Sequence, residues 1–429
     1  MSVSSPVLPQ ELLDKVIDDL QDDFEALKVC TLTSRSLLGR SQINLFFAIR
    51  ISNLQRCRRL RSVLEGNPLL SERVRELEVV DFIKWVKGDT DLPYILRATV
   101  LLRSLCVESS EDPLLWPMVP KDTVDALTSA FCRPTLCNLR MSMIRDFPVH
   151  LLGLEMNLAH LSLREVVLNP GTLDTTGHVD FSRTSAHTVE VCLDMPFLSD
   201  LAPYQAVAAK PCSFTSRIRN LVIHNTGMTM FLAVPFVESA AGSLETIQLR
   251  ERPSVNLERP RWFKYDFSTL RYLRRLELHF MLGFHSRNEF RHLTSVALRR
   301  MIDFFVDNRS ATRVKQINVR FIPWWNPSWQ APESQWVLDI LDIKNSWSEL
   351  DRILDAGRGS GESAGFRVGI ELGLPILDKQ EFIYGPVDEW RGGIEEKMDV
   401  WREMIHTLMP LASGAGVLVT DVIADVDSR

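Results

Sequence analysis

The chain has 429 residues, of which 45% are hydrophobic and 24% charged, which is ordinary for a folded protein long enough for two or three domains. Its formal net charge of −6 argues against a nonspecific grip on nucleic acid, which depends on clustered Lys and Arg side chains. The seven cysteines are odd in number and scattered, which favours a reducing compartment. No secretory signal or membrane-spanning stretch is recognisable, so we expect a cytoplasmic or nuclear protein without a membrane partner.

Residues 8–51 are predicted to form three short amphipathic helices. The first begins at Pro9, because proline fits the first helical position, where its missing N–H needs no acceptor. One side of this helix carries Leu12, Leu13, Val16, Ile17 and Leu20. Asp22 or Asp23 can cap a second helix, which carries Phe24, Leu27 and Cys30. A third apolar run follows through Leu37, Leu38, Ile43, Leu45 and Phe46, and a unit this small needs a partner surface.

The order of residues in this segment resembles the F-box, the module by which substrate receptors dock onto the Skp-type adaptor of cullin-RING (SCF) ubiquitin ligases. The residues that match the fungal form of the motif are Leu8-Pro9, Glu11-Leu12-Leu13, Ile17, Leu20, Leu27, Cys30, Leu32-Thr33-Ser34-Arg35, Ser41 and Leu45-Phe46. One departure is Leu37, which stands where many family members carry Trp. The resemblance implies an F-box over residues 1–52. It also implies adaptor contacts by Leu8, Pro9, Leu12, Leu13, Ile17, Leu27 and Leu45.

A weak repeat follows, in which apolar residues stand at positions −3, 0 and +2 around a central residue. The nine central residues are Leu77, Leu105, Leu139, Leu161, Val191, Leu221, Ile247, Leu276 and Ile317. Their spacing runs from 22 residues (139 to 161) to 41 residues (276 to 317), close to the period of about 20 to 29 in leucine-rich repeats once insertions are allowed. Each unit is predicted to contribute one short strand.

Segments of helical character lie between these strands, at residues 123–131, 231–240 and 292–306. We therefore expect an α/β fold in which the three-helix F-box precedes an irregular leucine-rich-repeat-like solenoid of short parallel strands and return helices, over residues 53–429. The Asn that regular repeats carry about five residues after the central Leu is missing, and Val166 and Met281 stand there instead. The inner backbone turn must then be satisfied in another way.

The C-terminal third differs in composition. Residues 320–336 include Trp324, Trp325, Trp329 and Trp336, which predicts a tryptophan-rich insertion after the ninth strand. Trp325 and Trp329 are our candidates for contact with a substrate, because exposed tryptophans dominate binding hot spots, although the same residues can instead pack onto the solenoid. Residues 346–429 contain further helices and strands and are predicted to cap the solenoid.

One motif points to enzymatic chemistry: residues 361–365 read Gly-Glu-Ser-Ala-Gly, the pattern of a serine esterase with Ser363 as nucleophile. That chemistry needs a strand before the serine and a helix after it, whereas here the predicted order is the reverse. Cys132 and Cys137 have no His or Cys pair at zinc spacing, and no Lys-bearing phosphate loop follows a strand. We expect no metal, no cofactor and no catalytic residues.

The sequence thus favours a non-catalytic substrate-recognition subunit of an SCF ubiquitin ligase. Its expected partners are a Skp-type adaptor, a cullin reached through that adaptor, and an unidentified protein substrate. A leucine-rich-repeat scaffold that acts outside a ligase, with the helical segment as its N-terminal cap, is the main alternative. A serine esterase using Ser363 is a remote alternative.

Overall fold

The computed structural model describes residues 8–85, 90–109, 112–148, 150–151, 156–169, 188–192, 214–225, 230–251, 264–284, 287–325, 343–358, 366–375 and 398–425. The chain divides into two compact units: unit 1 comprises Met1–Thr188 with Cys212–Phe214, and unit 2 comprises Val189–Pro211 with Thr215–Arg429. Both units combine helices with parallel strands, so the predicted α/β class is confirmed. None of the helices in the described ranges is both long and apolar enough to cross a lipid bilayer.

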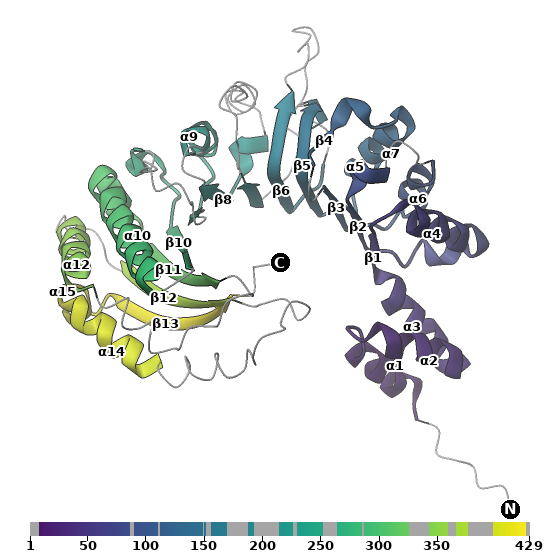
Figure 1. Cartoon of the computed structure of the whole chain (residues 1–429), viewed down its shortest axis with the longest axis horizontal. Helices are drawn as coiled ribbons and strands as arrows, with labels where there is room; N and C mark the ends of the chain where they lie inside the picture. The colour runs from purple at the N-terminus through teal and green to yellow at the C-terminus, as the bar shows by residue number, and fades with distance from the viewer. Residues whose placement is uncertain are drawn as a thin grey trace, which may run out of the picture. The chain divides into compact units, whose positions relative to one another are not determined.

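Unit 1 begins with three helices, α1 (Gln10–Asp19), α2 (Phe24–Thr33) and α3 (Arg35–Phe47) (Figure 1). Its strands are β1 (Ala48–Ile51), β2 (Glu76–Val80), β3 (Ser104–Glu108), β4 (Leu114–Leu115), β5 (Asn138–Pro148) and β6 (His160–Asn169). The remaining helices are α4 (Leu54–Gly66), α5 (Phe82–Trp85), α6 (Leu92–Ala98) and α7 (Lys121–Phe131), with 3-10 turns η1 (Pro68–Leu70) and η3 (Trp116–Met118). Strands β1, β2, β3, β5 and β6 pair in parallel in that order, and β4 pairs with β5.

The predicted strand centres of unit 1 occupy a single row across the sheet. Leu77 pairs with Leu105, Leu105 with Leu139 and Leu139 with Leu161, and none of the four side chains is more than 1% exposed. The apolar residues three positions earlier are buried as well. Because neighbouring parallel strands place equivalent residues about 4.8 Å apart, this row forms a continuous apolar seam under the helices.

Strands β5 and β6 stay buried on one side by means of bulges. The buried apolar side chains of β5 are Leu139, Met141, Ile144 and Phe147, which step by two and then by three residues. A step of three would turn a flat strand's apolar residue to the wrong face. Met143 (φ 57°) and Asp146 (φ 57°) absorb the extra residues, and Glu165 (φ 54°) does the same in β6. These left-handed conformations are strained for residues other than glycine, so the bulges are held by the packing around them.

Unit 2 contains strands β8 (Asn220–Asn225), β9 (Thr246–Glu251), β10 (Arg275–Phe284), β11 (Gln316–Trp325), β12 (Arg367–Pro375) and β13 (Leu418–Asp425), paired in parallel in this order. Its helices are α9 (Met230–Ser239), α10 (Arg287–Asp307), α12 (Lys344–Arg358), α14 (Met398–Leu408) and α15 (Pro410–Gly414), with 3-10 turns η8 (Phe267–Thr269) and η9 (Arg309–Arg313). Strand β7 (Thr188–Cys192) and turn η7 (Phe214–Arg217) lie where the chain passes between units. All nine predicted centres fall within strands.

The core of unit 2 repeats the arrangement of unit 1. Leu221, Ile247, Leu276, Ile317 and Val368 form one row of paired residues, and each side chain is fully buried. Helices α10 and α12 lie along one side of the strands (Figure 1). Trp347 of α12 packs edge-on against Phe321 of β11, with ring centroids 5.7 Å apart. The helices therefore cover the apolar face, and the opposite face carries polar side chains.

The strands run further than the repeat predicted. Val166 and Met281, which replace the expected Asn, lie inside β6 and β10, so the chain continues in the sheet where a regular repeat would turn. The inner backbone is satisfied by these longer ladders. Strand β11 likewise extends through residues 320–325, the first part of the predicted tryptophan-rich insertion. Pro323 is tolerated there because β12 stops pairing with β11 at Phe321, so a missing N–H breaks no bond on that side.

Candidate partner-binding surface on the first three helices

Each of the first three helices begins with a recognisable N-terminal arrangement. Pro9 precedes α1 in an extended conformation (ψ 143°), and its carbonyl accepts hydrogen bonds from the N–H groups of Leu12 (3.1 Å) and Leu13 (3.2 Å). Helix α1 thus starts at Gln10, one residue later than predicted. The Asp23 carboxylate caps α2 by accepting from the Ala26 N–H at 2.9 Å, which selects Asp23 over Asp22. The Ser34 hydroxyl accepts from the Ser36 N–H at the start of α3.

Polar contacts hold α1 against α3. The Arg40 guanidinium donates two hydrogen bonds to the Asp18 carboxylate, at 2.6 Å to Oδ1 and 2.5 Å to Oδ2. Asn44 Nδ2 donates to the Ile17 carbonyl (3.2 Å) and to Asp18 Oδ1 (3.1 Å). The hydrogen bond from Arg40 lowers the pKa of Asp18 below its ordinary value. A bidentate Arg–carboxylate pair fixes direction as well as distance, so it sets the register of α1 on α3.

The apolar core of the three helices is small. Ile17 of α1 is 1% exposed and Leu27 of α2 is fully buried, and the third buried residue is Ser41 of α3. Leu13, Leu37 and Leu45 are half-buried around this centre. Leu37, at the position where many F-box proteins carry Trp, is a smaller side chain beside a core that is already small.

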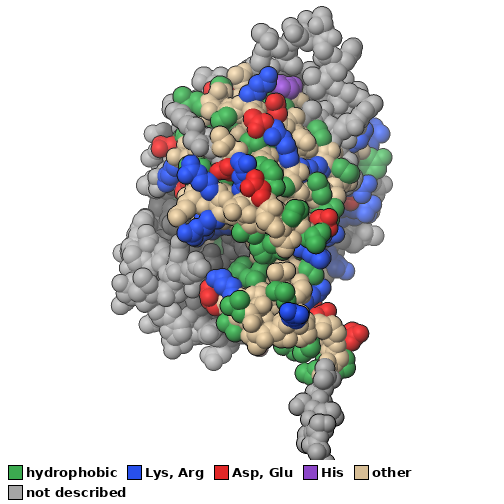
Figure 2. Space-filling view, turned by 90° about the vertical axis from the view of Figure 1, so that its right-hand side faces the viewer, with side chains coloured by type: hydrophobic (Ala, Val, Ile, Leu, Met, Phe, Trp, Pro, Cys, Tyr) green, Lys and Arg blue, Asp and Glu red, His purple; other side chains and the backbone are tan. Residues whose placement is uncertain are grey.

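The outer side of α1 carries an apolar stripe formed by Leu8, Leu12 and Val16. Their side chains are 56%, 49% and 54% exposed, respectively. Residues four apart lie one above the other on a helix, so the stripe runs along one line of α1 and onto the residue before it. Figure 2 shows hydrophobic side chains on the surface of this group, at the lower end of the view. A line of exposed apolar residues on a structured helix is typical of an interaction surface.

Further exposed apolar side chains lie on the other two helices. They are Phe24, Val29 and Leu32 of α2 and Phe47 at the end of α3, and Leu32 is 88% exposed. Helical periodicity alone did not identify them as contacts, because an exposed position on an apolar face and a buried one have the same spacing. Val16, Val29 and Leu32 are therefore added to the candidate surface by their exposure.

The structure separates the seven predicted adaptor contacts into two sets. Leu8, Pro9 and Leu12 are exposed, and Leu13 and Leu45 are partly accessible. Ile17 and Leu27 pack inside the three helices, where a rigidly docked partner does not reach them. We assign these two to holding the helices together. The segment ends differently from the prediction too, since Ala48–Ile51 forms β1 and pairs in parallel with β2.

The other predicted site residues are only partly visible. Trp325 is the last residue of β11, and its side chain lies outside the described part of the structure. Trp329 and Ser363 lie outside the described residues altogether. Asn308, which begins a formal glycosylation pattern, is 1% exposed: its Oδ1 accepts from the Tyr265 N–H at 2.6 Å. A buried side-chain amide that is already hydrogen-bonded is not accessible for glycosylation in the folded protein.

One cluster in the described residues has the geometry of a metal site. Glu78 on β2 and Cys106 and Glu108 on β3 place their ligand atoms within 4.8 Å of one another. Burial raises the pKa of the Cys106 thiol to about 12, and only a thiolate binds metal well. Glu78 Oε2 also lies 3.5 Å from Arg50 Nε, a cation in the same place. The chemistry of this group therefore suits an ion pair better than a metal.

Comparison with known proteins does not assign the chain to a family. No family model matches this sequence, and no curated protein is significantly similar to it. The candidate surface therefore depends on its own geometry and on the ordered residues of the motif.

Proposed function

We propose that the chain is a substrate-recognition subunit of an SCF-type ubiquitin ligase. In this proposal residues 8–51 are an F-box that docks onto a Skp-type adaptor, and the strand-and-helix units that follow form an irregular leucine-rich-repeat-like solenoid that holds a protein substrate. The observation that carries the proposal is the exposed stripe of Leu8, Leu12 and Val16, in a segment whose residue order resembles the F-box.

The energetics of the stripe support docking. Full burial of an aliphatic side chain of this size contributes roughly 1.5 to 3 kcal/mol, and the stripe residues are about half exposed, so each contributes about half of that. Together with exposed residues of α2 such as Leu32, the stripe offsets part of the entropy lost on association. The apolar residues of the strand ladder are already buried in the free chain, whereas those of the stripe are still about half exposed to solvent. The ligase chemistry belongs to other subunits in this proposal, and the present chain contributes position by raising the local concentration of substrate near the transferred ubiquitin.

The test is a binding measurement between the full chain and a purified fungal Skp-type adaptor. Leu12→Asp/Val16→Asp places two charges on the stripe at positions that are already exposed, so the fold is retained. We expect adaptor affinity to fall by about a hundredfold or more, because the partner must then bury unpaired carboxylates. The matched control is Val63→Asp/Leu69→Asp, which changes two exposed apolar residues outside the three helices and leaves affinity unchanged.

Two outcomes contradict the proposal. If the wild-type chain does not bind the adaptor, the scaffold alternative takes its place. If the stripe variant and the control variant bind equally well, the F-box resemblance does not describe the docking surface. Circular dichroism on both variants separates loss of binding from loss of fold.

A further inference from the structure

Unit 2 contains a basic groove at the start of its parallel strands. The groove has a volume of about 480 Å³ and is lined by Glu245, Thr246, Arg274, Arg275, Lys315, Gln316 and Arg367. Four of these residues are cationic and one is anionic, so the lining carries a formal charge of +4 − 1 = +3, in a chain whose net charge is −6. This local reversal of charge is the feature that selects the groove for further argument.

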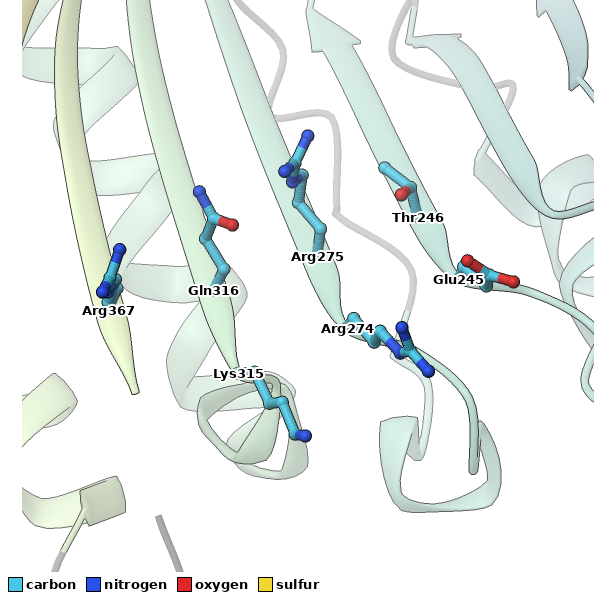
Figure 3. A pocket seen from close by; sticks show the side chains of 7 residues that line it. All are labelled: Glu245, Thr246, Arg274, Arg275, Lys315, Gln316 and Arg367. Atoms are coloured by element: carbon cyan, nitrogen blue, oxygen red, sulfur yellow. The ribbon is translucent and has the colours of Figure 1, made fainter. Parts of the chain in front are cut away.

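Strand register sets the positions of the lining residues. Thr246, Arg275, Gln316 and Arg367 are direct neighbours in the ladder of β9 to β12. Glu245, Arg274 and Lys315 come one residue earlier and form a second row. Figure 3 shows Arg275, Gln316 and Arg367 side by side across three strands, with Arg274 and Lys315 at the strand starts. With strands about 4.8 Å apart, β10 to β12 spread the cations over roughly 10 Å.

The cations of the groove are largely available to a ligand. Arg275 lies 3.7 Å from Glu277, and Glu245 faces Arg219 at 3.9 Å. In the part of the chain that the structure describes, Arg274, Lys315 and Arg367 have no carboxylate within ion-pair distance and are exposed. Bringing an anion to them breaks no existing pair and needs little desolvation.

The shape and donors of the groove favour an extended protein segment over a small anion. Phosphate sites are usually built from free backbone N–H groups at a helix start or a nest. Here the N–H groups of Arg274, Gln316 and Arg367 are already bonded to Glu245, Arg274 and Lys315 carbonyls, each at 2.9 Å. The cationic side chains of the groove, which are spread over several strands, are therefore its main binding groups. An extended chain presents alternate side chains about 6.6 to 7 Å apart, so two of its acidic side chains fit along a row of roughly 10 Å.

The lining also argues against nucleic acid. Proteins that bind single strands combine cations with aromatic side chains on which bases stack, and none of the described residues that line this groove is aromatic. We propose that unit 2 binds an acidic, extended segment of a protein partner, with Arg274 and Lys315 at the centre of the contact and Arg275 and Arg367 beside them. That this partner is a substrate for ubiquitylation rests on the proposed function above, whereas binding of the acidic segment does not.

The experiment measures fluorescence anisotropy of a labelled peptide of alternating Glu and Ser with the full chain. Arg274→Glu/Lys315→Glu is expected to weaken binding by about tenfold or more, because two attractive contacts become repulsive. Arg309→Glu/Arg352→Glu, two exposed arginines of unit 2 that do not line the groove, makes the same change in net charge and is expected to leave affinity within about twofold. Higher salt is expected to weaken wild-type binding.

Each opposite result overturns the inference. Equal weakening in both variants means that only net charge matters, and no binding to the wild type means that the groove is not a peptide site. Full displacement by inorganic phosphate at low millimolar concentration identifies a small-anion site, and tighter binding of a single-stranded oligonucleotide, lost in the groove variant, identifies a nucleic-acid site. Adaptor binding distinguishes failure of this inference from failure of the proposed function. Arg274→Glu/Lys315→Glu is expected to retain adaptor binding, and Leu12→Asp/Val16→Asp is expected to retain peptide binding.

Discussion

The three N-terminal helices and the strand ladder of unit 1 differ in how far their apolar side chains are buried. In the ladder, the central residues of β2, β3, β5 and β6 are at most 1% exposed and are covered by their own helices. In the helices only Ile17 and Leu27 are buried among the apolar residues, while Leu8, Leu12 and Val16 remain about half exposed. The ladder covers its own central apolar residues, whereas the helical segment leaves hydrophobic surface exposed, where a partner can bind.

The difference follows from how each element is packed. A strand inside a parallel ladder has neighbours on both sides and helices over one face, so each apolar side chain on that face is buried under the helices. Helix α1 packs mainly on α3, which it contacts through the pair between Asp18 and Arg40 and the hydrogen bonds donated by Asn44. One neighbouring helix covers only part of a broad apolar arc, and the remainder forms the stripe.

The largest expected effect compares two leucine truncations. Leu139→Ala removes a fully buried side chain from the centre of the unit 1 ladder and is expected to lower the free energy of unfolding by about 3 kcal/mol. Leu12→Ala removes a half-exposed one and is expected to change it by less than about 0.5 kcal/mol. Urea denaturation followed by tryptophan fluorescence measures both. If Leu12→Ala lowers the free energy of unfolding as much as Leu139→Ala does, the stripe contributes to the stability of the fold. The difference drawn between the helices and the ladder is then wrong.

A buried carboxylate in unit 2 provides the next test. Asp351 of α12 is 1% exposed, and its two oxygens accept from the N–H groups of Leu411 (2.8 Å) and Ala412 (2.9 Å) at the start of α15. Asp351→Ala leaves two backbone donors without their acceptor, one buried and one part-buried, and is expected to destabilise unit 2 by about 2 kcal/mol. Asp355→Ala, on an exposed position of the same helix, is the control and is expected to be near neutral. Hydrogen exchange of α15 amides, measured by mass spectrometry, reports the local effect.

The sequence predicts the ladder well because its signal is repeated. Leu77, Leu105 and Leu139 each sit in the same local pattern, and their alignment in one row is what that pattern requires. Strand lengths are harder to predict: the bulges at Met143 and Glu165 break the alternation of two, so the pattern loses its period where the strand continues. The cause is a backbone conformation that neither residue type favours.

The candidate sites are less visible in the sequence, for two different reasons. The stripe lies on a helix whose apolar residues were recognised, but spacing does not show that Leu13 and Ile17 are covered while Leu12 and Val16 stay exposed. The basic groove is not visible as a sequence motif, because Arg274, Lys315 and Arg367 are far apart in the sequence and become neighbours only through strand register. A row of cations at strand starts becomes apparent only after the strands are aligned.

A smaller effect tests how α1 is held on α3. Because the Arg40 hydrogen bond lowers the pKa of Asp18 in the folded chain, the pair stabilises the fold above the unfolded pKa of about 3.9 and is lost as pH falls through the lower folded value. Asp18→Asn is therefore expected to speed amide exchange in α1 at pH 7, and this effect is expected to shrink as the pH falls through the lowered pKa of Asp18. Both partners are more than a third exposed, so solvent screening keeps the effect modest. An effect that does not change as the pH is lowered would assign the role to the Asn44 hydrogen bond.

The smallest expected effect is a gain in stability in the helical segment alone. Gly39 lies inside α3, and a Cβ added there meets no atom within 4 Å. Gly39→Ala is expected to stabilise the three helices by about 0.5 to 1 kcal/mol, because alanine loses less backbone entropy than glycine in a helix. Slower amide exchange in α3 with unchanged adaptor affinity places the docking surface on α1 and α2. Slower exchange with weakened affinity instead places part of the interface on α3, since the added methyl group then occupies space that the partner needs.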